Sequence, residues 1–562
     1  MQIKKLSVMN FKSFKELNFN FKKINIILGP NNSGKSNLFR FLLLLKQTVT
    51  SNLKAPLLLN GNTINLGAYK DISYRYNSKK LSINIIISKL LKYAFYVDED
   101  NESFEEEEEF IATDFEISYE LDIDFEINKI KFVSYQIKNL KSNKSILEFK
   151  IDEYLNLEGM PIAEYNSRII QILHLIIREL EYLKNYKFIT QKNLYKKVLK
   201  ITQELEIKLD YPNLDSLINH FIKNASNFKQ DIIKINFNGI IPEVEIRSDL
   251  FYDPIYHIRE FSRILSSRDV YDRLEDFFVD PKISSMKHHI SSLKEFLKQL
   301  SDIEERLDDI GTKFTNFEMN IDNFFENLYY IGPLRNFPQR YYPISGEVAS
   351  DVGFKGEFTP HILKESSEKE EKDNLLDKIN VWLNKFEMAS HIKIKEYKEI
   401  QEFISLMFYE FYSGLRVNLT DMGVGTSQVL PIIIEGFIIE KDSLFLVEQP
   451  EIHLHPKAQA ILGDLFIELA KENKTILIET HSEHIFQRIQ RRIAEGVISS
   501  NDVAFYYVTM GKEGSVIKIL NLDQYGYIQN IPKGFFSEDF EEAYEHLKAV
   551  NERKQMKNKR EE

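Results

Sequence analysis

One loop near the N-terminus restricts the possible folds of this chain more than any other segment. Gly29–Ser36 reads Gly-Pro-Asn-Asn-Ser-Gly-Lys-Ser, which matches the phosphate-binding pattern GxxxxGK[ST]. The apolar, β-prone segment Lys23–Leu28 precedes the loop and the Leu-rich segment Asn37–Gln47 follows it. This is the strand-loop-helix context that the motif requires, so the sequence predicts an α/β domain that binds a nucleotide.

The residue types of this loop suit the chemistry of ATP and Mg²⁺. Glycines allow backbone N–H groups to converge on phosphate oxygens, and the positive end of the following helix faces the same oxygens. Lys35 can reach the β- and γ-phosphates, and the Ser36 hydroxyl can be a ligand of Mg²⁺. We expect ATP to contact the whole loop, namely Gly29, Pro30, Asn31, Asn32, Ser33, Gly34, Lys35 and Ser36.

A carboxylate follows a second buried strand far along the chain. Ser443–Val447 is short and apolar, and Glu448-Gln449-Pro450-Glu451 comes directly after it. In P-loop proteins a carboxylate in this position, known as Walker B, holds Mg²⁺ beside the phosphate loop. A lone acidic residue after a strand can also be a simple strand cap. The phosphate loop in the same chain favours the metal-site role for Glu448.

Two further segments are candidates for phosphate contacts. His481 follows the apolar strand Thr475–Ile478, where it is either an ordinary surface histidine or a contact of the γ-phosphate. Its position one strand-helix unit after Glu448 favours the phosphate contact. Asp421–Gln428 opens an apolar helix, where backbone N–H and hydroxyl groups can bind phosphate, and a simple loop is the alternative. Its candidate residues are Gly423, Gly425, Ser427 and Gln428.

The middle of the chain contains two different periodicities. In Leu81–Asp152 apolar residues alternate at period two, which predicts antiparallel strands, with the acidic run Glu105–Glu109 as a solvated loop between them. Glu164–Asn327 is expected to be helical, because Leu293 to Phe324 carry apolar residues at heptad spacing. Ile169–Leu183 is a candidate antiparallel partner, and both a projecting arm and a compact bundle fit this pattern.

These patterns divide the chain into four parts. Residues 1–160 and 329–520 are expected to form the two halves of one ATPase head, the first including an antiparallel β lobe. Residues 161–328 form an inserted helical arm or bundle, and 521–562 form a C-terminal extension. Parallel α/β layers of this kind alternate strands and helices along the chain, as the second half does.

The composition excludes several classes of site. The chain has no cysteine, so thiolate nucleophiles, disulfides and cysteine-based zinc sites are excluded. Its formal net charge is -12, so any nucleic-acid contact must be a local basic patch. The longest apolar runs, Val429–Ile439 and Ile169–Leu180, contain charged residues and are too short to cross a bilayer. We expect a soluble cytoplasmic protein without a membrane partner.

Taken together, the motifs resemble the ABC-type ATPase heads of the RecF, SMC and OLD-like group, which share the same order of elements. The resemblance implies a homodimer or higher oligomer, in which Gly423, Gly425, Ser427 and Gln428 of one subunit cap the ATP of the other. It makes His481 the switch histidine and places His453–Pro456 in a loop at the dimer interface. The turn Asn10–Phe14 resembles the N-terminal turn of the group, with Lys12 near the nucleotide.

A closer resemblance is to prokaryotic anti-phage defence ATPases, including that of Septu systems. It is carried by Tyr330–Arg335, Gly423–Pro431, Glu448–Pro456 and Glu479–His484. It implies an ATPase that regulates a partner effector, such as a nuclease of the HNH type. No Asp-x-Asp motif follows Arg492, although the nuclease domain of OLD-like proteins would need one. The segment 530–549, with its acidic helix pattern, is a candidate for docking the partner.

This chain departs from the pattern of the group at the catalytic position. Gln449 stands where many such ATPases have a catalytic glutamate, and glutamine cannot accept a proton from water. Either Glu451 or Glu448 acts as the base, or hydrolysis is slow and ATP serves mainly as a clamp. The loop that supplies a glutamine in the group should lie at Leu66–Asp71, where only Asp71 is a candidate.

Three other functions remain open at this stage. A DNA-repair ATPase of the SMC or RecF kind would bind DNA ends, although the insertion is short for that class. A non-hydrolysing ATP sensor would retain ATP without turnover, as Gln449 would allow. The nucleotide subunit of a transporter is disfavoured by the long insertion.

Overall fold

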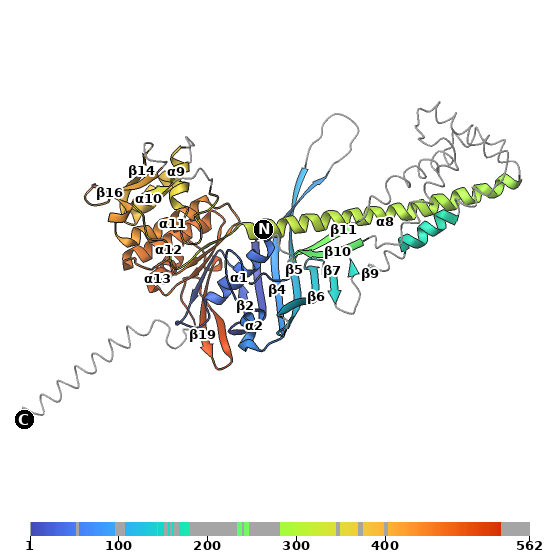
Figure 1. Cartoon of the computed structure of the whole chain (residues 1–562), viewed down its shortest axis with the longest axis horizontal. Coiled ribbons are helices and arrows are strands. Elements are labelled where there is room, and N and C mark those ends of the chain that lie inside the picture. The colour runs from blue at the N-terminus through green and yellow to red at the C-terminus, as the bar shows by residue number, and fades with distance from the viewer. Residues whose placement is uncertain are drawn as a thin grey trace, which may run out of the picture.

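The computed structural model describes residues 2–51, 55–95, 107–126, 128–142, 144–150, 156–157, 160–161, 168–178, 233–238, 241–246, 281–343, 349–368, 375–397 and 403–529. Figure 1 shows a helix-rich α/β region on one side and a β lobe on the other, with one long helix projecting beyond the lobe. The candidate docking segment 530–549 lies outside the described residues.

A six-stranded sheet forms the centre of the head. Its strands follow the order β12-β17-β18-β3-β19-β20, and all neighbours are parallel except β19 and β20. The bounds are β3 (Ile24–Leu28), β12 (Leu328–Ile331), β17 (Leu444–Glu448), β18 (Thr475–Glu479), β19 (Val503–Gly511) and β20 (Gly514–Leu520). Residues from both ends of the chain therefore build one sheet.

Helices cover both faces of this sheet, which explains why its inner strands are apolar throughout. Ile27 and Leu446 pack with α1 (Ser36–Val49) and the β lobe in one core. Their neighbours Ile26 and Val447 pack on the opposite face with helices of the second half of the chain. Those helices are α11 (Val424–Ile438), α12 (Pro456–Lys471) and α13 (Glu483–Ala494).

The β lobe is an eight-stranded antiparallel sheet with the order β2-β1-β4-β5-β6-β7-β8-β9. Its strands are β1 (Gln2–Phe11), β2 (Phe14–Asn20), β4 (Lys80–Phe95), β5 (Glu107–Asp124), β6 (Lys129–Asn139), β7 (Lys144–Lys150), β8 (Asn156–Leu157) and β9 (Met160–Pro161). Alternate side chains such as Ile117, Tyr119 and Leu121 are buried, as the period of two predicts. The expected α/β head with an antiparallel lobe is confirmed.

The structure corrects the prediction that the acidic run Glu105–Glu109 is a loop. Its last three residues, Glu107 to Glu109, belong to β5 and pair with Tyr93 to Phe95 of β4. The prediction of a loop is wrong for these positions. The local charge density disfavours a strand, but β4 supplies a long continuous pairing edge that extends the ladder.

The long helix α8 (Pro281–Glu326) has 46 residues and carries the predicted heptad positions on one continuous helix. It extends away from the head (Figure 1). Residues 168–178 are also helical, and their Ile169 and Ile176 share a core cluster with Leu293 and Leu300 of α8. Gly311 lies inside α8 without ending it, since one glycine costs only about 1 kcal/mol in a helix.

A short hairpin interrupts the segment that was expected to be helical. Strands β10 (Ile233–Asn238) and β11 (Ile241–Ile246) pair with each other, and β11 packs against α8. The helical prediction is wrong here. Alternation of Ile233, Ile235 and Phe237 with polar residues was the missed signal.

Among the described residues, no helix is both long and apolar enough to span a bilayer.

A small antiparallel sheet lies beside α11 on the outer side of the head. It contains β13 (Tyr342–Pro343), β14 (Ala389–Tyr397), β15 (Phe403–Glu410) and β16 (Arg416–Asn418). Helices α9 (Thr359–Glu368) and α10 (Leu375–Lys385) pack between this sheet and α11. The short helices α2 (Tyr69–Ile72) and η2 (Leu419–Asp421) complete the elements used below.

Candidate nucleotide-binding site

The phosphate loop joins β3 to α1 and needs glycine at both ends. Gly29 has φ +142°, and a Cβ there would lie 2.2 Å from the carbonyl oxygen of Val508. Gly34 has φ +100°, and a Cβ there would lie 2.3 Å from the Ser515 hydroxyl. The same hydroxyl lies 2.6 Å from the carbonyl oxygen of Ser33. Strands β19 and β20 therefore support the loop from behind, which the sequence analysis did not foresee.

Lys35 already lies over its own loop. Its Nζ donates to the carbonyl oxygens of Gly29 and Pro30, at 3.0 and 2.9 Å. Burial lowers the pKa of Lys35, while the nearby carboxylates of Glu479 and Glu451 oppose that shift. A phosphate group can replace the two carbonyls as partner of this ammonium, which is the role that the motif predicts for it.

Two carboxylates stand side by side opposite the loop. Glu448 ends β17 and Glu479 ends β18, and the two residues are paired in register. The Ser36 hydroxyl donates to Glu479 Oε1 at 3.1 Å, and the Tyr330 hydroxyl donates to Glu448 Oε1 at 3.0 Å. Burial and the adjacent Glu479 raise the pKa of Glu448 to about 7. Burial also raises the pKa of Glu479.

Such a donor set fits a divalent cation. Mg²⁺ binds oxygen ligands, commonly one or two carboxylates together with substrate phosphates. Ser36, Glu448 and Glu479 supply a hydroxyl and two carboxylates next to the lysine that would hold the phosphates. Sequence reasoning named Ser36 and Glu448 but missed Glu479, although this residue also ends a buried strand.

Glu451 and Gln449 shape the turn after β17. Glu451 Oε1 accepts from the backbone N–H of His481 at 2.7 Å, and Oε2 accepts from the Thr480 hydroxyl at 2.8 Å. Gln449 has φ +46°, and its backbone N–H donates to the carbonyl oxygen of Glu479 at 2.7 Å. Both residues thus tie the turn after β17 to the loop after β18.

His481 is exposed at this edge of the sheet, where Glu451 holds its backbone. Partial desolvation and the charge of Lys35 lower the pKa of His481. This shift favours the neutral imidazole, which can donate one hydrogen bond while accepting another. The structure brings His481 close to Lys35 of the phosphate loop and, through its backbone N–H, to Glu451.

Arg335 is a buried residue of the site that sequence reasoning used only for a resemblance. Its Nη2 donates to the backbone carbonyl oxygen of Glu448 at 2.9 Å. Its Nε and Nη1 atoms are buried without a hydrogen-bond partner, close to the charge of Glu451. The segment Tyr330–Arg335, which begins in β12, thus holds both the side chain and the main chain of Glu448.

The candidate signature residues form a separate group at the start of α11. Ser427 donates to the carbonyl oxygen of Val424 at 2.8 Å, and Gln428 lies 3.5 Å from the Ser427 hydroxyl. Gly425 packs against the turn after β17, since a Cβ there would lie 2.8 Å from the carbonyl oxygen of His453. A Cβ at Gly423 would meet nothing within 4 Å. Gly423 therefore faces open space, whereas Ser427 and Gln428 are buried.

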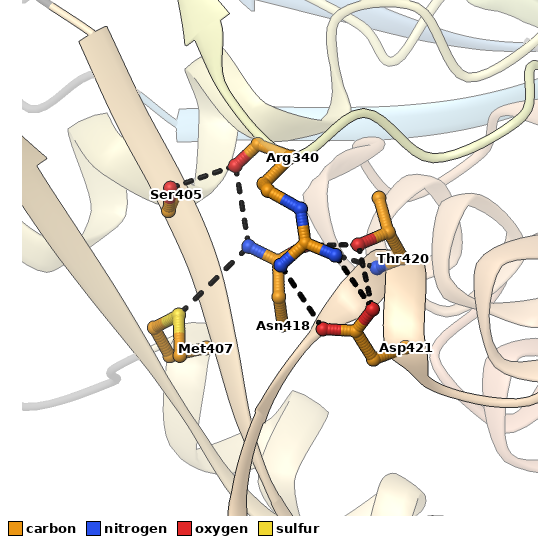
Figure 2. Close-up of polar contacts among 6 residues, drawn as sticks. All are labelled: Arg340, Ser405, Met407, Asn418, Thr420 and Asp421. Carbon is orange, nitrogen blue, oxygen red and sulfur yellow. Dashed lines mark hydrogen bonds and ion pairs between the residues drawn. The ribbon is translucent and has the colours of Figure 1, made fainter.

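An ion pair and a hydrogen-bond cluster fix the approach to α11 (Figure 2). Arg340 makes a bidentate pair with Asp421, at 2.7 and 3.1 Å. The carbonyl oxygen of Arg340 accepts from the Ser405 hydroxyl and from the Asn418 amide, and Asn418 Oδ1 accepts from the N–H of Thr420. These contacts hold the chain before Gly423 against β15.

The N-terminal turn lies against the phosphate loop through Ser13 rather than through Lys12. Asn37 of α1 donates to the Ser13 hydroxyl at 2.8 Å. Lys12 has φ +48°, and its Nζ donates to the carbonyl oxygen of Asp71 at 3.4 Å. The Asp71 carboxylate accepts from the N–H of Ala68 and so caps α2.

This arrangement agrees with the family to which the sequence is assigned. Residues 1–486 match the family described as AAA ATPase domain. The chain belongs to this family. Residues 498–544 match a second family, described as a protein of unknown function (DUF3696). No curated protein matches the chain. The expectation of a P-loop ATPase is thus confirmed.

Solved structures similar to this ATPase include heads of SMC proteins. One is the Smc head of Pyrococcus furiosus with an extended coiled coil bound to the C-terminal domain of ScpA, at 12% identity, 98% and 99% coverage of the two chains and a TM-score of 0.31. Another is the Smc head of Pyrococcus yayanosii with a coiled coil and joint, at 14% identity, 93% and 98% coverage and a TM-score of 0.33. The SMC head of Thermotoga maritima matches at 10% identity, 93% and 100% coverage and a TM-score of 0.31.

Proposed function

We propose that two copies of this chain close around ATP and Mg²⁺, and that the closed dimer regulates a partner effector, a nuclease of an anti-phage defence system. The proposal of a dimer rests on one observation: within one chain, the candidate nucleotide-binding residues form two separate groups. Lys35, Ser36, Glu448 and His481 are gathered at one edge of the sheet, whereas Gly423 faces open space at the start of α11.

The start of α11 suits an anionic group supplied by another molecule. No side chain caps this helix, and its N-cap residue Gly423 leaves the first N–H groups uncovered. Helix N-termini bind phosphate through such groups. The γ-phosphate held by Lys35 of a second copy has the matching charge. Nucleotide would then be the element that joins two heads.

Hydrolysis is expected to be slow. Gln449 cannot act as a base, and both carboxylate oxygens of Glu451 already accept hydrogen bonds. Burial raises the pKa of the Glu448 carboxyl to about 7, and this group is the remaining candidate base. Bound ATP therefore holds the dimer closed, and its slow hydrolysis sets how long the dimer stays closed.

Light scattering with nucleotide tests the dimer. The purified chain should be a monomer without nucleotide and a dimer with Mg²⁺ and a non-hydrolysable ATP analogue, whereas Lys35→Ala should remain monomeric. A wild-type chain that binds the analogue and stays monomeric would contradict the proposal. Phosphate release measured beside Lys35→Ala separates slow turnover from a pure ATP sensor.

The effector role rests on the resemblance to defence ATPases and needs its own experiment. Tagged chain would be recovered from its source cells with the ATP analogue, in parallel with Lys35→Ala. A nuclease retained only by the wild-type chain supports the proposal. Nucleotide-dependent binding to DNA ends without a protein partner would favour the SMC-like alternative.

A further inference from the structure

We propose that Glu479 contributes a ligand oxygen to the divalent cation that accompanies ATP, together with Ser36. This inference deepens the proposed ATP function and rests on it. It assigns to the residue at the end of β18 a role that the sequence motifs give only to Glu448 and Ser36. The cation would contact Glu479 Oε2 directly or through one bound water.

The two oxygens of Glu479 have different surroundings. Oε1 accepts the Ser36 hydroxyl at 3.1 Å. Oε2 is buried and has no hydrogen-bond partner, on a residue that is 4% exposed. A buried carboxylate oxygen without a partner costs free energy, so folded proteins rarely leave one unless a ligand or ion completes it. Oε2 lies on the carboxylate that already contacts the predicted metal ligand Ser36.

Two other acidic groups, Glu451 and Asp71, are committed to other contacts. Both oxygens of Glu451 accept hydrogen bonds from the loop after β18. The Asp71 carboxylate caps α2. Glu448 is paired in register with Glu479 and accepts from Tyr330. Glu479 and Glu448 are thus the two carboxylates in position to face a cation beside Ser36.

The charge balance explains why this site would need nucleotide. Two adjacent buried carboxylates repel each other, and a divalent cation between them and the phosphates would offset that repulsion. Within the described residues, no group of three or more His, Asp or Glu side chains is arranged to hold a metal. Mg²⁺ prefers six oxygens, so phosphate oxygens must complete the set. Cation binding should therefore be weak without ATP and strong with it.

Titration with Mn²⁺, followed by electron paramagnetic resonance, tests the inference without using activity. The full-length chain would be titrated in the presence of a saturating non-hydrolysable ATP analogue. Glu479→Gln should raise the Kd for Mn²⁺ by about tenfold or more, the range found when a group next to a metal ligand is changed. Binding of a fluorescent ATP analogue in EDTA should not weaken, because the substitution removes a negative charge beside Lys35.

Glu435→Gln is the matched control. Glu435 lies on α11, is 2% exposed and accepts a hydrogen bond from the N–H of Val352, outside the nucleotide site. The same isosteric change at a similarly buried carboxyl should leave the Kd for Mn²⁺ at the wild-type value. If Glu479→Gln does not fold, Glu479→Asp serves instead, because it keeps the charge and withdraws the oxygens by one methylene; it should also weaken Mn²⁺ binding.

The outcomes separate this inference from the proposed function. Wild-type Mn²⁺ affinity in the folded Glu479 variant, with nucleotide bound, overturns the role of Glu479 and leaves ATP binding intact. Equal weakening by Glu435→Gln also overturns it, because the effect would then be a general loss of a buried carboxylate. Failure of the wild-type chain to bind nucleotide would overturn both.

Discussion

Glu448 and Glu479 end neighbouring parallel strands in the same register, so the fold holds two buried carboxyl groups side by side next to Ser36. Burial raises the pKa of both groups, and the charge of Glu479 raises the pKa of Glu448 further. The chain keeps this unfavourable pair at the point where a nucleotide and cation would lie. This arrangement leads to predictions on binding, stability and assembly.

Replacement of Lys35 should strongly weaken nucleotide binding. Lys35→Ala removes the ammonium that lies over the loop, and the affinity for a fluorescent ATP analogue should fall by roughly 100-fold, about the loss of one buried charge-assisted contact. Lys474→Ala is the control, because Lys474 is also buried and donates to a backbone carbonyl oxygen, that of Gly436 at 2.7 Å. It should lower the melting temperature and leave nucleotide affinity unchanged; a similar loss of affinity in both variants would contradict the prediction.

The stability of the nucleotide-free chain should fall as pH rises from about 5 to 8. The folded-state pKa of Glu448 is raised from 4.5 to about 7, so between these values the native state holds a proton that the unfolded chain has lost. Glu435, with a pKa of about 8, acts in the same direction. The loss from Glu448 is on the order of 3 kcal/mol. Thermal melts in buffers across this range measure it.

Glu448→Gln provides the check on that slope. The amide does not titrate, so the variant should lose less stability between pH 5 and pH 8 and should melt above the wild-type chain at pH 8. Glu468→Gln, at an exposed position of α12, should keep the wild-type slope. An identical slope in the Glu448 variant would show that this carboxyl does not titrate as the structure indicates.

Gly423→Asp should separate folding from dimerisation. A side chain at Gly423 meets open space in its own chain, and aspartate is a favoured N-cap residue, so the melting temperature should equal or exceed that of the wild type. A carboxylate at this position would repel the phosphate bound to a second copy. The variant should bind ATP as a monomer in light scattering.

Mixing two defective chains tests the exchange of residues between subunits. Lys35→Ala keeps an intact α11 start, and Gly423→Asp keeps an intact phosphate loop, so one heterodimer contains one complete site. The mixture should form nucleotide-dependent dimers that neither variant forms alone. No recovery on mixing, with both variants folded, would argue against a site shared between two chains.

Gly425 and Gly423 should respond differently to the same substitution. A methyl group at Gly425 would approach the carbonyl oxygen of His453 to 2.8 Å, so Gly425→Ala should destabilise the chain by about 1 to 3 kcal/mol. Gly423→Ala should leave the free energy of unfolding nearly unchanged. Urea unfolding of the two variants gives the comparison, and equal stabilities would contradict the packing of α11 against this turn.

The sequence by itself determined the local elements of the site. The phosphate loop, the strand that ends in Glu448 and the heptad pattern of α8 were predictable because each depends on neighbouring residues and on a periodicity of two or 3.6. The hairpin β10–β11 was missed because its short alternation lies inside a longer stretch expected to be helical.

Only the tertiary structure decided which distant residues meet. Glu479 contacts Ser36 because the sheet places β18 between β17 and β3, and Ser515 supports the phosphate loop because β20 returns beside β19. Arg335 reaches the main chain of Glu448 because β12 is the neighbour of β17. Strand order follows from the packing of helices on both faces of the whole sheet, and no local sequence pattern specifies that arrangement.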